Sequence, residues 1–276
     1  MRFLQCLIGE FDVVDKTPRR QSVARWFLRS YLGRIVIALV LIVMVQVILV
    51  WLTFVLPYQR EQRIAKEIEA RGIGEVGWTD CTPGWIQNFV PMRYETRYLD
   101  RISSVRFHGE VTDAELDRLR WLTSLKSLDF TFARVNDAGV ERLKGLTSLV
   151  ELDFVSTQIT DAGLKHLQGL KSLGYLHLDN TQITDTGLGY LKELRNLIAL
   201  EMSQTQVTDV GLKHLAGMAR LEYLTLSQTQ VTDAGLNELK GLISLKSVSL
   251  NATQTTPDGR AMLRKALPAC TISPNP

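Results

Sequence analysis

The strongest constraint on the fold is a sequence pattern that returns every 24 residues over most of the chain. One copy, which begins at Leu146, reads LTSLVELDFVSTQITDAGLKHLQG. Equivalent lines begin at Leu122, Leu146, Leu170, Leu194, Met218 and Leu242, after a 23-residue line that begins at Leu99. Self-similarity at such a period is typical of a solenoid, in which each repeat buries its apolar residues against the next. We therefore predict seven stacked repeats over residues 99–265.

Each repeat divides into two halves with different periodicity. The first half, L-x-x-L-x-L, alternates as a short strand with one buried face. The second half, T-D-x-G-L-x-x-L, spaces its apolar residues three apart after a Thr-Asp pair. That pattern predicts a short helix with Thr or Asp as its N-cap. The chain is thus predicted to form an α/β solenoid with one strand and one helix in each repeat.

These motifs make residues 99 to about 272 similar to the leucine-rich-repeat family, whose frame is L-x-x-L-x-L-x-x-N/C-x-L. The half written I-T-D-A-G-L resembles a subtype found in F-box-associated and many bacterial proteins, and the chain resembles bacterial membrane-anchored members. No F-box is visible, so a ubiquitin-ligase role does not carry over. The resemblance implies a horseshoe with a parallel concave sheet, short convex helices and a protein-binding role.

The ninth position of the frame departs from the family. There an Asn or Cys turns inward and bonds neighbouring backbones, whereas this chain has mostly threonine. The residues are Ala133, Thr157, Thr181, Thr205, Thr229 and Thr253. The departure implies a ladder of hydroxyl groups, which has less hydrogen-bonding capacity than an amide ladder.

An apolar run from Ile35 to Leu56 precedes the repeats and contains only two polar residues, Gln46 and Thr53. As a helix it is about 33 Å long, enough to cross a hydrocarbon core of about 30 Å. The 34 preceding residues and the length of the run argue against a cleaved signal peptide. We therefore predict a transmembrane signal-anchor helix over residues 35–56 of a single-pass membrane protein.

Basic residues flank this run unequally. Within a comparable distance, six precede it and four follow it: Lys16, Arg19, Arg20, Arg25, Arg29 and Arg34, then Arg60, Arg63, Lys66 and Arg71. Because cytoplasmic flanks are enriched in Lys and Arg, we expect a cytoplasmic N-terminus and an extracytoplasmic repeat domain.

The remaining segments are assigned as flanks of these two parts. Residues 1–34 form a basic cytoplasmic tail, and 57–98 form a stalk and N-terminal cap. The aromatic residues of that cap could instead form an exposed ligand patch. Residues 266–276 form a C-terminal cap strand and tail. The cysteines Cys6, Cys81 and Cys270 show no zinc-site spacing, and Cys81 and Cys270 lie too far apart along the solenoid to pair.

The outward residues of the predicted strands are acidic toward the middle of the solenoid. His177 lies among carboxylates, with tyrosines beside them; the predicted partner-binding residues are Asp129, Glu151, Asp153, Tyr175, His177, Asp179, Glu201 and Tyr223. A solvated sheet face explains such residues too. However, parallel neighbours lie about 4.8 Å apart, so Asp129 beside Asp153 is a repulsive arrangement that a binding surface for a cation would explain.

Three functions follow in order of preference. The first is a membrane-tethered module that binds a basic or amine-bearing protein partner on its concave face. The second is a structural, envelope-organising protein that acts through lateral packing of solenoids. An enzyme is a distant third, because no nucleophile sits in a strained turn and an open sheet does not exclude water. A metal on Asp153, His177, Asp179 and Glu201 is an alternative, but we predict no cofactor, and a net charge of +3 does not indicate nucleic acid.

Overall fold

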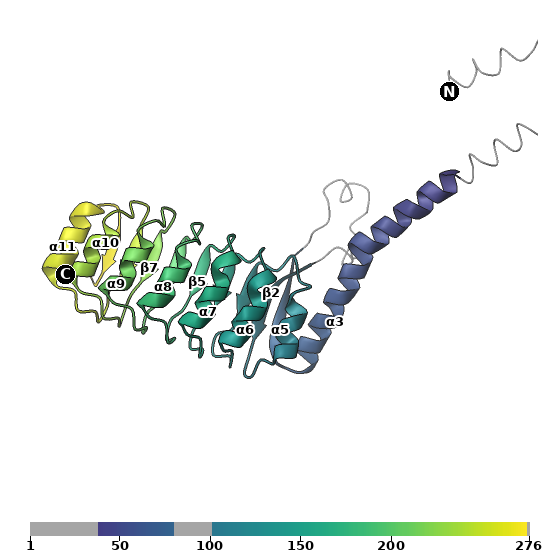
Figure 1. The fold of residues 1–276 in the computed structure, drawn as a ribbon, viewed down its shortest axis with the longest axis horizontal. Helices are drawn as coiled ribbons and strands as arrows, with labels where there is room; N and C mark the ends of the chain where they lie inside the picture. Colours follow the sequence, from purple (N-terminus) through teal and green to yellow (C-terminus); the bar gives the residue numbers. More distant parts are fainter. Residues whose placement is uncertain (1–37, 80–100, 275–276) are drawn as a thin grey trace, which may run out of the picture. The chain divides into compact units, whose positions relative to one another are not determined.

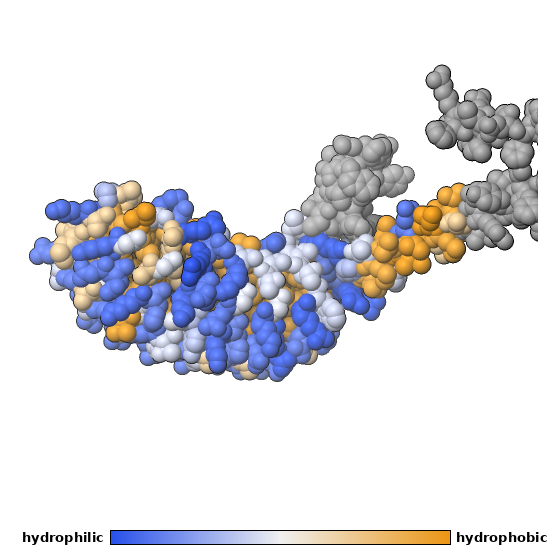
Figure 2. Space-filling view, turned by 45° about the horizontal axis from the view of Figure 1, so that its top comes forward, coloured by the Kyte–Doolittle hydropathy of each residue, from blue (hydrophilic) through white to orange (hydrophobic). Residues whose placement is uncertain are grey.

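The structure is a computed structural model that describes residues 38–79 and 101–274. The chain divides into two compact units, Met1–Val55 and Leu56–Pro276 (Figure 1). The described part of the first unit is helical from residue 38 and ends in the π-helical turn η1 (Trp51–Val55). Its apolar side chains are about half exposed, Leu39 at 56% and Leu52 at 47% among them. The helix Ala38–Ala70 contains a stretch long and apolar enough to cross a membrane (Figure 2).

The described residues of the second unit form a nine-stranded sheet in which the strands follow one another in chain order. The strands are β1 (Gly74–Thr79), β2 (Arg101–Phe107), β3 (Ser127–Asp129), β4 (Glu151–Asp153), β5 (Tyr175–His177), β6 (Ala199–Glu201), β7 (Tyr223–Thr225), β8 (Ser247–Ser249) and β9 (Thr271–Ser273). Strands β2 to β9 pair in parallel, and β1 pairs antiparallel with β2. The parallel sheet of the predicted solenoid is confirmed. The count of seven repeats and the segment bounds stay predictions.

Short helices connect successive strands and line up along the opposite side of the unit (Figure 1). They are α5 (Asp113–Leu119), α6 (Asp137–Glu141), α7 (Asp161–Lys165), α8 (Asp185–Leu191), α9 (Asp209–Leu212), α10 (Asp233–Leu239) and α11 (Pro257–Ala266). The 3-10 turns η3 (Arg142–Gly145), η4 (His166–Gly169) and η5 (Lys213–Leu215) extend three of them. The repeated leucines of strands and helices meet between the two layers and form one continuous core.

The threonine of the predicted N-cap begins these helices. The Thr184 side chain, for example, accepts a hydrogen bond from the N–H of Thr186, and equivalent bonds occur in α7, α9 and α10. In α6 the cap is Asn136, which accepts from Gly139. The following Asp is the first helical residue and carries out a different task, which the sequence did not reveal.

That Asp binds the next repeat. Asp137 accepts hydrogen bonds from both the N–H and the hydroxyl of Thr160, at 2.8 and 2.7 Å. The same pair of bonds recurs four more times, from Thr184, Thr208, Thr232 and Thr256 to the Asp one repeat earlier. At these five junctions, neighbouring repeats are therefore joined by a carboxylate as well as by the sheet.

The inward threonines do not form the expected ladder between repeats. The Thr181 hydroxyl donates to the carbonyl of Leu178, 2.6 Å away and in the same repeat, and the equivalent threonines behave alike. The reason is the preceding residue, which adopts a positive φ in every repeat and turns the chain back on itself. These residues are Phe132, Ser156, Asn180, Gln204, Gln228 and Ala252.

The N-terminal end of the sheet is covered by α3 (Leu56–Ala70) and β1. Ile64, Ala65 and Ile68 of α3 are buried in the core. Glu61 on the same helix is 2% exposed, accepts from the N–H of Ile102 at 2.9 Å and pairs with Arg101 at 3.1 Å. Burial raises the pKa of Glu61, and the interactions with Ile102 and Arg101 offset only part of that increase.

Candidate functional site

The parallel register aligns the outward side chains into columns across the sheet; we call the surface formed by these columns the strand face. The middle column comprises Arg106, Asp129, Asp153, His177, Glu201, Thr225 and Ser249. A second column comprises Ser104, Ser127, Glu151, Tyr175, Ala199, Tyr223 and Ser247. Seven of the eight residues predicted for the site lie in these columns. Thr131, Val155, Asp179 and Ser203 follow the strands by two residues and belong to a third.

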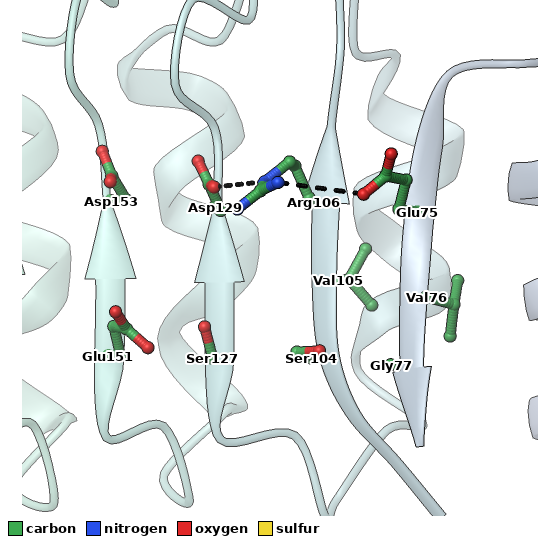
Figure 3. A pocket seen from close by; sticks show the side chains of 10 residues that line it. All are labelled: Glu75, Val76, Gly77, Ser104, Val105, Arg106, Ser127, Asp129, Glu151 and Asp153. Carbon is green, nitrogen blue, oxygen red and sulfur yellow. Dashed lines mark hydrogen bonds and ion pairs between the residues drawn. The ribbon is translucent and has the colours of Figure 1, made fainter.

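An ion-pair network occupies the N-terminal end of the strand face (Figure 3). Arg106 Nε lies 2.6 Å from Asp129 Oδ2, and its guanidinium lies 3.8 Å from Glu75 on the antiparallel strand β1. An open hollow of about 340 Å³ lies here, and Glu151 and Asp153 also line it. The sequence prediction missed Glu75 and Arg106. Arg106 is the first residue of the middle column, so the aligned repeats could have identified it. Glu75 lies outside the repeats, and nothing in the sequence aligns it with Arg106.

The expected repulsion between Asp129 and Asp153 is relieved locally. Asp129 accepts from the N–H of Thr131 at 2.8 Å, and Asp153 accepts from that of Val155 at 2.9 Å. Burial alone would raise the pKa of Asp129, but the Thr131 hydrogen bonds and the Arg106 ion pair outweigh it and lower that pKa. Both aspartates therefore stabilise the turn that follows their own strand.

Asp179 has a related structural role. Its Oδ1 accepts from the N–H of Ser203 in the next repeat at 2.7 Å. Burial raises the pKa of Asp179, with a further contribution from the nearby Glu201 carboxylate, and the bonds from Ser203 only partly offset this.

His177 and Glu201 form the charged pair at the centre of the strand face. His177 Nδ1 lies 3.1 Å from Glu201 Oε2, and the two side chains are 19% and 38% exposed. The hydrogen bond to Glu201 raises the pKa of His177, against the effect of burial, and the charges of Asp153 and Glu151 raise it further. The same bond lowers the pKa of Glu201. Glu201 is therefore the main cause of the raised His177 pKa, whereas Asp153 contributes only through its charge.

Two tyrosines lie beside this pair. Tyr175 and Tyr223 are 38% and 42% exposed, and the buried Ala199 lies between them in the register. The tyrosine strands are separated by two strand spacings, about 10 Å. Glu151, paired in register with Tyr175, is exposed and lines the hollow. The centre of the strand face thus presents aromatic rings next to carboxylates.

The alternative of a metal site finds no support in the described ranges, where no group of three His, Cys, Asp or Glu residues is arranged to hold a metal ion. Cys270 is a buried free thiol whose pKa is raised by that burial. Cys6, Cys81 and most of the aromatic residues of the proposed cap lie outside the described residues. Among the described ones, Trp78 on β1 is partly buried against the core.

Comparison with known proteins agrees with this architecture. Family models described as leucine rich repeat match residues 122–144, 145–167 and 173–231. These residues match the leucine-rich-repeat pattern. No curated protein matches the sequence.

Two internalins of Listeria monocytogenes are similar in structure to this chain. Internalin InlF is 21% identical with a TM-score of 0.46, over 58% of this chain and 50% of that chain. Internalin C2 is 26% identical with a TM-score of 0.48, over 62% of this chain and 81% of that chain. The chain therefore matches only half of the length of InlF.

Proposed function

We propose that this leucine-rich-repeat chain is a membrane-tethered module that binds a basic segment of a protein partner on its strand face. The observation that supports it most is the set of neighbouring, partly exposed groups Glu151, Tyr175, His177, Glu201 and Tyr223. A Lys or Arg side chain combines an apolar stem with a charged head. Tyrosine rings suit the stem, and the carboxylates suit the head.

The tether rests on the apolar helix in the first unit. Its apolar side chains are about half exposed, which is unfavourable in water and favourable in lipid. With the excess of Lys and Arg before the span, we place the repeats outside the cytoplasm. A scaffold role without catalysis suits an open sheet on which Asp129, Asp153 and Asp179 are engaged by backbone N–H groups.

The test is chemical crosslinking of the full chain in its native membrane, followed by affinity purification. The variant Glu151→Lys/Glu201→Lys reverses charges that are not bonded to backbone. The control Glu141→Lys reverses a charge on helix α6, on the other side of the unit. A partner lost only from the strand-face variant supports the proposal. A partner that all three chains recover equally contradicts it, and self-crosslinks alone would favour the envelope-organising function.

A further inference from the structure

A separate basic surface follows the apolar segment in the chain. Arg60, Arg63 and Lys66 are spaced three apart on α3, so Arg63 neighbours both others and the three span about a third of the helix circumference. All three are exposed. Within the described residues none of them forms an ion pair, whereas Glu67 on the same helix pairs with Arg71 and Arg118. These three charges are therefore left for a ligand.

Trp121 completes the surface from the loop between α5 and β3. Its ring is 49% exposed and lies between two cations, with the Arg60 guanidinium carbon 5.0 Å and that of Arg120 4.9 Å from the ring centroid. A hollow of about 340 Å³ lined by Arg60, Arg63 and Trp121 opens beside it. Trp rings flanked by arginines are suited to the boundary between lipid tails and head groups, because the ring is apolar and the cations bind phosphate.

The length of chain to the apolar run limits where this surface can lie. Arg60 is four residues beyond Leu56, where the apolar run ends, so it lies within about 15 Å of that point whatever the orientation of α3. If the run crosses the bilayer, Arg60 cannot leave the neighbourhood of the head groups. The tether then supplies a high effective concentration of lipid, which no soluble partner has.

We propose that Arg60, Arg63, Lys66 and Arg120, together with Trp121, bind the anionic head groups of the membrane that anchors the chain. The inference rests on the proposed membrane span. Attraction of basic residues to an anionic surface is worth about a factor of five for each cation. The contact holds the N-terminal end of the repeat unit against the lipid surface.

The experiment uses the full chain in nanodiscs of phosphatidylcholine, with or without phosphatidylglycerol. A nitroxide is attached at Thr123→Cys, two residues from Trp121, in a chain whose native cysteines are replaced, and its collisions with a water-soluble relaxation agent are measured. The exposed site Ile243→Cys serves as the reference. The variant is Arg60→Gln/Arg63→Gln/Lys66→Gln, and the control Lys165→Gln/Lys213→Gln/Lys240→Gln removes equal charge from the helix side.

We expect phosphatidylglycerol to lower the accessibility at position 123 severalfold and to leave position 243 unchanged. The α3 variant should abolish the change, the control variant should keep it, and 0.5 M salt should weaken it. Equal accessibility at position 123 in both lipids would overturn the proposal. Failure of the chain to enter nanodiscs at all would instead refute the membrane span. Neither result depends on the partner of the strand face.

Discussion

Single carboxylates on the strand face differ in what they remain free to bind. Asp129, Asp153 and Asp179 each accept a hydrogen bond from a backbone N–H group. Glu201 bonds only the His177 side chain among the contacts described for it, and Glu151 is exposed. Removing an aspartate would disturb the fold, because a partly buried N–H donor would lose its acceptor. The glutamates are therefore the residues by which binding can be tested apart from stability.

The His177–Glu201 pair should make stability depend on pH. The pKa of His177 is raised in the folded chain, so protonated His177 adds to the free energy of unfolding. This contribution is complete below the unfolded pKa of about 6.5 and is lost as pH rises through the folded pKa. The pKa of Glu201 is lowered in the folded chain, so ionised Glu201 also adds to the free energy of unfolding. This contribution is lost as pH falls through the folded pKa of Glu201. The pair therefore stabilises the fold between these limits, by about 0.5–1 kcal/mol because both side chains are partly exposed.

An NMR titration of the imidazole tests this pair. Glu201→Gln should return the His177 pKa toward its ordinary value, and Asp153→Asn should lower it by less, since Asp153 acts only through its charge. Protonated His177 would also weaken capture of a cationic partner in acid. A His177 pKa that does not respond to Glu201→Gln would show that the two side chains do not meet.

The motif T-D-x-G acts as one unit at the scale of structural elements. The Thr caps its own helix, and the Asp accepts from the Thr of the next repeat. The glycine leaves room for the Asp of the preceding repeat. A Cβ on Gly163 would lie 2.6 Å from Asp137 Oδ1, and the four repeats that follow show the same approach at 2.0–2.4 Å. Helix spacing therefore depends on a glycine that local helix propensity disfavours.

A double-mutant cycle between Asp137 and Gly163 should reveal this dependence. Asp137→Ala removes both bonds from Thr160 and should cost about 2 kcal/mol. Gly163→Ala should cost about 1–2 kcal/mol in the wild type, because the methyl group meets Asp137. In the Asp137→Ala background the same change should gain about 0.5 kcal/mol, since the clash is gone and alanine favours the helix.

Urea unfolding of the four chains gives the coupling free energy directly. Gly145→Ala serves as the control, because a Cβ there meets nothing within 4 Å. Additive costs of Asp137→Ala and Gly163→Ala would contradict the proposed dependence of the glycine on the aspartate.

At the scale of the whole molecule, the second unit includes the elements that cover both ends of its core. α3 and β1 close the N-terminal side, where the buried Glu61 binds β2, and α11 with β9 closes the other. A solenoid is stable when its terminal repeats are covered. We therefore expect residues 56–276 to fold as a soluble monomer without the apolar segment.

Size-exclusion chromatography and amide NMR of this fragment test that expectation. Sharp, dispersed signals from a monomer are the expected result. As a comparison, Glu61→Ala should broaden signals near β2 first, because it leaves the N–H of Ile102 without its acceptor. An aggregated or molten fragment would mean that the apolar segment contributes to the fold.

Membrane topology is a second whole-molecule prediction. Cys270 is a poor reporter because it is buried, whereas Ile243 is 85% exposed. An impermeant maleimide should label Ile243→Cys from outside intact cells and should not reach Cys6, if the Lys/Arg asymmetry sets the orientation. Labelling at Cys6 alone would reverse the proposed topology.

The sequence by itself determined the strand face. A fixed period places equivalent residues in register between neighbouring repeats, so the middle column from Asp129 to Glu201 could be read directly from the aligned lines. The alternation of leucines likewise determined which side chains enter the core. Local rules were enough here because every repeat meets an almost identical neighbour.

The tertiary structure alone decided the contacts outside this periodicity. The pairing of β1 with β2 brings Glu75 to Arg106, and Glu61 reaches β2 from a helix some forty residues earlier. No repeated pattern aligns these segments. Even inside the repeats, the sequence did not predict the bonds of Asp137 to the next repeat, and the expected threonine ladder was wrong because Thr181 bonds within its own repeat. Periodicity specifies which residues recur, but the direction of a hydrogen bond depends on backbone turns such as the positive φ before each threonine.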